Sequence, residues 1–141
     1  MEKPNIITVK KPKSPISEAY RTLRTNIQFS SFDKEVKTIV ITSSAPNEGK
    51  TTTAVNLAVT LAQSGHSTII VDCDQRRPSL HRVFNISNEK GLSNILIGEV
   101  SFQEAVKTTE IQNLSLITSG TVPPNPAELL ASNKMEKFMN F

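Results

Sequence analysis

The stretch TSSAPNEGKTT, residues 42–52, decides the fold because of what lies on either side of it. Before it, residues 38–42 are β-branched or apolar without alternation, which is typical of a strand buried on both faces of a parallel sheet. After it, apolar side chains recur at helical spacing until Gly65, a residue type that often closes a helix. A second apolar run, residues 67–71, follows directly. Strand, helix and strand with short connections predict a right-handed βαβ unit.

Within this stretch, residues 44–51 match the phosphate-loop pattern G-x-x-x-x-G-K-[ST], except that serine replaces the first glycine. Such a loop works because backbone N–H groups and a helix N-terminus converge on phosphate oxygens. Gly49 allows close backbone approach, Lys50 adds a charge for the terminal phosphates, and Thr51 offers a hydroxyl to Mg²⁺. The predicted nucleotide-binding residues are Ser44, Ala45, Pro46, Asn47, Glu48, Gly49, Lys50, Thr51 and Thr52. The alternative is an ordinary strand-to-helix turn that carries G-K-T by chance.

A second signal is DCDQRRP, residues 72–78, directly after the second apolar run. Two carboxylates two residues apart, Asp72 and Asp74, point to the same face of an extended chain, and Cys73 points away. Parallel strands end at a common edge, so both carboxylates are expected near a bound magnesium nucleotide, with Thr51 as a further metal ligand. Cys73 is expected to be a core residue. The alternative is that the acidic residues only cap a loop.

The composition bounds the class of protein. The 141 residues suit one domain, and a net charge of +3 does not indicate nucleic-acid binding. Cys73 is the single cysteine, which favours a reducing compartment, and no run approaches the roughly 20 apolar residues of a membrane span. Residues 1–14, rich in lysine and proline, are expected to form a basic flexible arm, and residues 15–141 the domain.

The remaining elements complete an α/β pattern. A helix is predicted from the apolar spacing after Pro15, with Ser14 or Ser17 as its cap. Short helices are predicted in LSNILIGE and SFQEAVK, and a strand in residues 114–120. A C-terminal helix is predicted with Asn125 as cap, Pro126 in its first turn and an apolar face of Leu129, Leu130, Met135 and Phe138. The predicted fold is a three-layer, doubly wound, mostly parallel sheet of the P-loop NTPase type. Only three strands emerge, so the sheet is expected to be incomplete.

Together these motifs resemble those of the bacterial tyrosine kinases of capsular and exopolysaccharide biosynthesis, which are P-loop proteins unrelated to eukaryotic protein kinases. The phosphate loop of that family commonly begins with alanine or serine, as here at Ser44. Its second motif, three apolar residues followed by D-x-D-x-R, is matched by residues 69–71, Asp72, Asp74 and Arg76. The segment SGTVPPNPAELL also fits a family segment, and the likeness spans about residues 14–133.

The resemblance implies a tyrosine kinase that transfers the γ-phosphoryl group of ATP. Its implied catalytic residues are Lys50, Asp72, Asp74 and Arg76, with ATP and Mg²⁺ as cofactors. In that arrangement Asp72 orients the water shell of the metal and accepts the tyrosine proton. Related kinases pair with a membrane-anchored activator of the polysaccharide co-polymerase type, whose cytoplasmic tail completes the ATP site. The implied location is therefore cytoplasmic, at the inner face of the membrane through that partner.

The family also carries an E-x-x-R-x-x-R pattern at the interface of a ring-shaped oligomer. Here Glu18, Arg21 and Arg24 match it on the predicted first helix. Without the resemblance, a charged strip of this kind would equally well be a solvated helix face, worth only tenths of a kcal/mol. With the resemblance, an intersubunit role in a homo-oligomer is favoured.

Two family features are not found in this chain: a later strand ending in D-x-x-P and a C-terminal tyrosine cluster. The only tyrosine, Tyr20, lies on the apolar face of the first helix and is expected to pack. Two alternatives therefore stay open. One is a non-catalytic kinase remnant that joins kinase rings. The other is a partitioning-type or division-site-selecting ATPase, which is disfavoured because Ala45 and Pro46 stand where those proteins carry an additional lysine.

Overall fold

The computed structural model describes residues 5–44 and 49–140. The chain divides into two compact units that are interleaved in sequence. The N-terminal unit comprises Asn5–Thr68 and Glu110–Leu114, and the C-terminal unit comprises Ile69–Thr109 and, among the described residues, 115–140. Chain connectivity therefore crosses between the units more than once.

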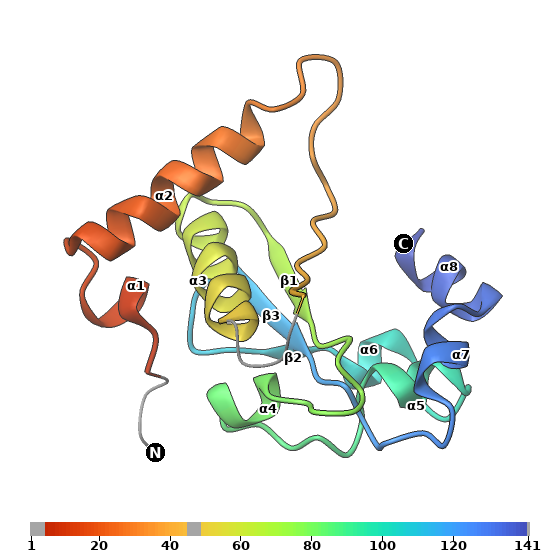
Figure 1. Cartoon of the computed structure of the whole chain (residues 1–141). Helices are drawn as coiled ribbons and strands as arrows, with labels where there is room; N and C mark the ends of the chain where they lie inside the picture. The colour runs from red at the N-terminus through yellow and green to blue at the C-terminus, as the bar shows by residue number, and fades with distance from the viewer. Residues whose placement is uncertain (1–4, 45–48, 141) are drawn as a thin grey trace. The chain divides into compact units, whose positions relative to one another are not determined.

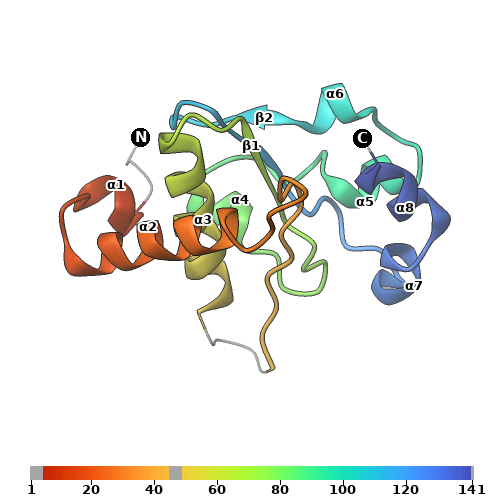
Figure 2. The same cartoon turned by 90° about the horizontal axis from the view of Figure 1, so that it is seen from above.

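Three helices form the N-terminal unit: α1 (Ile7–Lys10), α2 (Pro15–Gln28) and α3 (Lys50–Gln63). They lie side by side in both views (Figures 1 and 2). The α2 helix begins where predicted, because the Ser14 side chain accepts a hydrogen bond from the Ser17 backbone N–H and Pro15 occupies the first helical position. Of the two predicted caps, Ser14 is therefore the cap. The α3 helix is followed by Gly65 at φ +93°, as its sequence predicts.

The predicted flexible arm is wrong for its described part. Residues 7–10 form α1, the Ile6 side chain is buried, and Thr8 has no exposed surface. Tertiary contacts order this segment although its sequence shows no helical periodicity. One turn of helix is too short to be stable alone, so packing against the rest of the N-terminal unit must hold it.

The strand predicted at residues 38–42 is also wrong. These residues carry no strand assignment and lie outside the three-stranded sheet, and Val40 is 81% exposed. An extended segment becomes a strand only by exchanging backbone hydrogen bonds with a neighbour. The β-branched composition signals a preference for that pairing but cannot supply the partner.

The sheet has the order β1-β3-β2, with β1 (Thr68–Val71), β2 (Lys107–Thr108) and β3 (Leu114–Ile117). The Thr68 N–H donates to the Asn113 carbonyl at 2.8 Å, and the Asp72 N–H donates to the Ile117 carbonyl at 3.0 Å. Residue numbers rise together along the two strands, so β1 and β3 are parallel, as predicted. The two-residue β2 pairs antiparallel with β3 and was not predicted.

Helices of the C-terminal unit are α4 (Leu80–Val83), α5 (Leu92–Leu96), α6 (Phe102–Ala105), α7 (Pro126–Leu130) and α8 (Asn133–Met139). The predicted short helices match α5 and α6, whereas the predicted C-terminal helix is two helices, because Ser132 caps a new one. The predicted apolar face is confirmed: four partly buried side chains pack against the core of Leu92, Leu96 and Ile117, namely Leu129, Leu130, Met135 and Phe138.

A reciprocal capping box begins α6. The Ser101 hydroxyl accepts from the Glu104 backbone N–H, and the Glu104 carboxylate accepts from the Ser101 backbone N–H at 3.2 Å. Hydrogen bonds from the backbone and side chain of Ser101 lower the pKa of Glu104 below its ordinary value. The box therefore stays intact at neutral pH and is lost only when acid protonates this carboxylate.

Candidate functional site

The helix that follows the phosphate loop starts on a left-handed glycine. Gly49 has φ +78° and ψ 16°, and Lys50 is the first residue of α3. A Cβ built on Gly49 would meet no atom within 4 Å, so the backbone conformation, not lack of space, requires glycine in this structure. Glycine also supplies no side-chain cap to the 14-residue helix. A helix N-terminus of this kind suits an anionic ligand.

The predicted loop residues are only partly described. Ser44, Gly49 and Thr52 are exposed, whereas Lys50 and Thr51 are half-buried. The other four predicted residues lie outside the described residues: Ala45, Pro46, Asn47 and Glu48.

In the C-terminal unit, the Asp72 carboxylate organises the turn after β1. Its Oδ1 accepts from the Asp74 N–H at 3.0 Å, and its Oδ2 accepts from the N–H groups of Ser79 and Leu80 at 3.0 and 3.1 Å. The Ser79 side chain does not cap α4, so Asp72 takes that place from seven residues upstream. Asp72 is 5% exposed, and these charge-assisted bonds hold its carboxylate in one orientation.

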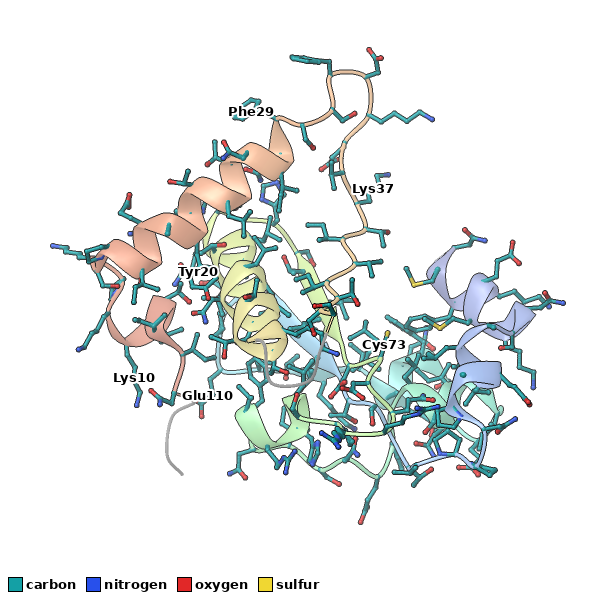
Figure 3. The ribbon with its side chains drawn as sticks, viewed as in Figure 1. Lys10, Tyr20, Phe29, Lys37, Cys73 and Glu110 are labelled. Carbon is teal, nitrogen blue, oxygen red and sulfur yellow. The ribbon has the colours of Figure 1, made fainter. Side chains whose placement is uncertain are left out.

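The neighbours of Asp72 differ in their surroundings. Asp74 is half-buried and its Oδ1 accepts from the Arg77 N–H at 3.0 Å, while Arg76 is exposed. Cys73, labelled in Figure 3, is exposed, so its predicted place in the core is wrong. Gln75 was not singled out from the sequence, yet its amide is buried and has no hydrogen-bond partner among the described residues.

The predicted metal ligands belong to different units. Thr51 lies in the N-terminal unit, whereas Asp72 and Asp74 lie in the C-terminal unit, so the three-residue set stays a prediction. Among the described residues, no three His, Cys, Asp or Glu side chains gather as a ligand set. A hydroxyl and two carboxylates nevertheless suit Mg²⁺, which prefers oxygen ligands and is usually held by few protein groups together with water and phosphate.

Comparison with known proteins agrees with these motifs. A family profile described as an AAA domain matches residues 36–139. Tyrosine-protein kinase YwqD of Bacillus subtilis (strain 168) is 47% identical over 133 residues, which are 94% of this chain and 56% of the relative. The kinase domain of Escherichia coli tyrosine kinase ETK superposes with a TM-score of 0.93 at 34% identity, covering 99% of this chain and 55% of that one.

The chain belongs to the bacterial tyrosine kinase family. The chimerical protein CapA2B2 superposes with a TM-score of 0.91 at 47% identity, over 96% of this chain and 59% of that chain. This member of the family spans little more than half the length of YwqD, and 19% of the length of tyrosine-protein kinase etk of Escherichia coli (strain K12). The septum site-determining protein MinD complexed with Mg-ADP, from Pyrococcus horikoshii OT3, shares only the P-loop fold, at 23% identity and a TM-score of 0.56.

The kinase-family strip on α2 is partly engaged within the chain. Arg21 and Glu18 form an exposed ion pair at 2.7 Å, which contributes little to stability. Arg24 instead donates from Nη1 to the Thr60 carbonyl of α3 at 3.0 Å. The ring interface stays a prediction, and Arg24 has an additional role in joining two helices of the N-terminal unit.

In this family member, the turn after β3 is clamped by residues that sequence reasoning missed. The Asn88 side-chain oxygen accepts from the Gly120 N–H at 2.8 Å, and the Asn88 side-chain nitrogen donates to the Gly120 carbonyl at 2.9 Å. The N–H groups of Leu92 and Ser93 donate to the carbonyls of Thr118 and Ser119. The only sequence signal was the presence of glycine and asparagine in two stretches that read as loops.

None of the described helices of this kinase-family chain is both long and apolar enough to cross a membrane.

Proposed function

We propose that this chain forms the nucleotide-binding part of an ATP-dependent protein tyrosine kinase that acts in capsular or exopolysaccharide biosynthesis. The observation that carries this proposal is the left-handed Gly49 directly before Lys50 at the start of α3. That arrangement combines a helix N-terminus with a lysine, and both suit the phosphates of a nucleoside triphosphate.

In the proposed reaction, Lys50 binds the terminal phosphates, and backbone N–H groups of the predicted phosphate loop donate to them. Thr51 and Asp74, with Asp72 acting through the water shell, would hold Mg²⁺, which would neutralise charge on the phosphates. The three backbone bonds to Asp72 use three of about four acceptor sites of a carboxylate. Its Oδ1 therefore keeps one acceptor site, which would accept either from a water of the metal shell or from the tyrosine hydroxyl, but not from both at once. Arg76, exposed beside it, supports the developing charge.

The partners follow from the same family reading. We propose a membrane-anchored activator of the polysaccharide co-polymerase type whose cytoplasmic tail completes the ATP site and brings the chain to the inner face of the membrane. We also propose a homo-oligomeric ring through Glu18, Arg21 and Arg24, tyrosine-containing protein substrates, and no nucleic acid.

A second candidate is a non-catalytic module that joins kinase rings. It is favoured by apolar side chains on and just after α2 that face solvent: Ile16, Leu23 and Phe29, the last labelled at the end of the helix in Figure 3. This module would co-assemble with a full-length relative, and changing both Arg21 and Arg24 to alanine would abolish the assembly.

Binding of a fluorescent ATP analogue with Mg²⁺ tests the nucleotide site. Lys50→Met is expected to weaken binding at least about tenfold, because it removes the cation from the phosphates. Lys37→Met is the matched control, since Lys37 is an exposed lysine of the same unit, labelled in Figure 3, outside the loop. Equal binding by wild type and Lys50→Met would overturn the proposed site.

Tyrosine phosphorylation is tested separately, by incubating the chain with Mg-ATP and an activator tail and probing for phosphotyrosine. Phosphotyrosine that disappears in Lys50→Met supports the kinase. Stimulated ATP hydrolysis without phosphotyrosine would favour the partitioning-type ATPase instead. Nucleotide binding with neither activity would favour the non-catalytic module.

A further inference from the structure

A buried polar network joins α1 to α3 inside the N-terminal unit. The Thr8 backbone N–H and its hydroxyl both donate to the Asn56 side-chain oxygen, at 3.1 and 2.7 Å. Thr8 has no exposed surface, and Asn56 is 2% exposed. Both partners are therefore shielded from water, where each hydrogen bond matters most because an unpaired group would have no alternative partner.

The network reaches the first turn of α3. The Asn56 side-chain nitrogen donates to the Thr52 carbonyl at 2.8 Å. Thr52 is the last residue of the predicted phosphate loop and the third residue of α3. The Gln63 side-chain amide donates to the Thr8 carbonyl at 3.5 Å, so Thr8 of α1 is bonded to α3 at two residues, Asn56 and Gln63.

The same network extends toward α2. The buried Ser17 hydroxyl donates to the Lys11 carbonyl at 2.7 Å, just after α1. A continuous path of hydrogen bonds and chain therefore runs from the start of α2, through α1, to the start of α3. All of its members belong to the N-terminal unit.

Stability alone does not account for an asparagine at this position. Asn56 lies between Val55 and Leu57 in a buried stretch of α3, where an apolar side chain would pack without polar atoms to satisfy. A buried amide that is bonded through both its oxygen and its nitrogen fixes the orientation of the groups on either side of it. Its planar group accepts hydrogen bonds on one side and donates them on the other. Here the accepting side faces α1 and the donating side faces the phosphate-loop turn.

We propose that Thr8 and Asn56 are positioning residues for the first turn of α3, from Lys50 to Thr52, and that α1 orients this turn through them. The inference rests on the proposed nucleotide site and adds to it a part of the chain outside the loop motif. Disturbing Thr8 should weaken nucleotide binding although Thr8 lies outside the nucleotide site.

The test uses the full chain with three substitutions. Thr8→Val removes the hydroxyl donor but keeps the shape and the backbone bond, and Thr8→Ser restores the donor. Thr60→Val is the matched control, because Thr60 is an equally buried threonine of α3 whose hydroxyl donates to the Leu57 carbonyl of its own helix. The readouts are the Kd for a fluorescent ATP analogue with Mg²⁺ and the hydrogen exchange of the Thr53 amide, which bonds the Gly49 carbonyl.

Thr8→Val is expected to raise the Kd roughly three- to tenfold and to speed exchange at Thr53, with Thr8→Ser close to wild type and Thr60→Val unchanged in both. A Thr8→Val protein that is less stable but keeps the wild-type Kd and exchange rate would overturn the inference. If wild type binds no nucleotide, the proposed function fails. Exchange at Thr53 then decides alone: equal rates in Thr8→Val and Thr60→Val overturn the positioning role, and a faster rate in Thr8→Val supports it.

Discussion

At the scale of single residues, Asp72 combines two tasks that are usually separated. It directly follows β1 at the edge where ligands bind parallel sheets, and its carboxylate also accepts from N–H groups of the turn that leads into α4. From the sequence alone, these two tasks were alternatives: metal and proton chemistry on one side, capping of a loop on the other. The structure shows the capping of the loop directly. The catalytic task stays a proposal that a stable variant must test.

Replacing Asp72 by alanine is expected to destabilise the fold by about 3 kcal/mol, because three backbone N–H groups lose a charged acceptor. Asp74→Ala is the comparison and is expected to cost less than Asp72→Ala, since the bond that Asp74 accepts from the Arg77 N–H is exposed to water. Urea unfolding of both variants measures the difference. Similar costs for the two would contradict the structural role of Asp72.

At the scale of elements, the turn after β3 and the start of α5 approach so closely that no side chain fits between them. A Cβ on Gly91 would lie 2.2 Å from the Gly120 nitrogen and 2.3 Å from the Thr118 carbonyl oxygen. Both are backbone atoms held by hydrogen bonds, to Asn88 and to the Leu92 N–H, so moving either one would strain or break those bonds. This explains a glycine at a position whose φ of −135° any residue could adopt.

Gly91→Ala is therefore expected to destabilise the protein by about 3 kcal/mol or more through backbone overlap. Gly98→Ala provides a contrast within the same helix region, because Gly98 has φ +82° but open space around its Cα. That substitution should cost only about 1 kcal/mol of backbone strain. Thermal unfolding in which Gly98→Ala is the more damaging change would refute this reading of the turn.

Elements with local signals were the ones that the sequence predicted well. The Ser14 cap, the glycine after α3 and the apolar face of the C-terminal helices each act within a few residues, and the structure contains all three. The strand at 38–42 and the described part of the arm, residues 5–14, failed for the opposite reason. Pairing and docking depend on distant segments, as the bond from Thr8 to Asn56 illustrates, and no local pattern reports them. The same holds for the candidate site: its motifs could be read from the sequence, but the hydrogen bonds from α1 to α3 could not.

At the scale of the whole molecule, the segment TIVIT, residues 38–42, has the composition of an aggregation-prone strand, with high β-propensity and neither charge nor proline. It lies outside the sheet with Val40 largely exposed.

Val40→Lys is expected to reduce concentration-dependent self-association, as measured by light scattering over a dilution series, because a charge opposes strand pairing. Val122→Lys adds the same charge at another exposed valine, 65% exposed, outside this segment. A larger effect at residue 40 than at residue 122 would localise association to the segment. Equal effects would attribute it to net charge alone.

The interleaving of the two units limits how this protein can be divided. Strands β1 and β3 each begin in one unit and continue in the other, near residues 68–69 and 114–115, and the chain crosses again near 109–110. No single cleavage can therefore release either unit as a continuous fragment. For split-protein reporters or exchange of parts between relatives, the consequence is practical: a single junction leaves at least one unit incomplete, so only transfers that keep both units together preserve the sheet.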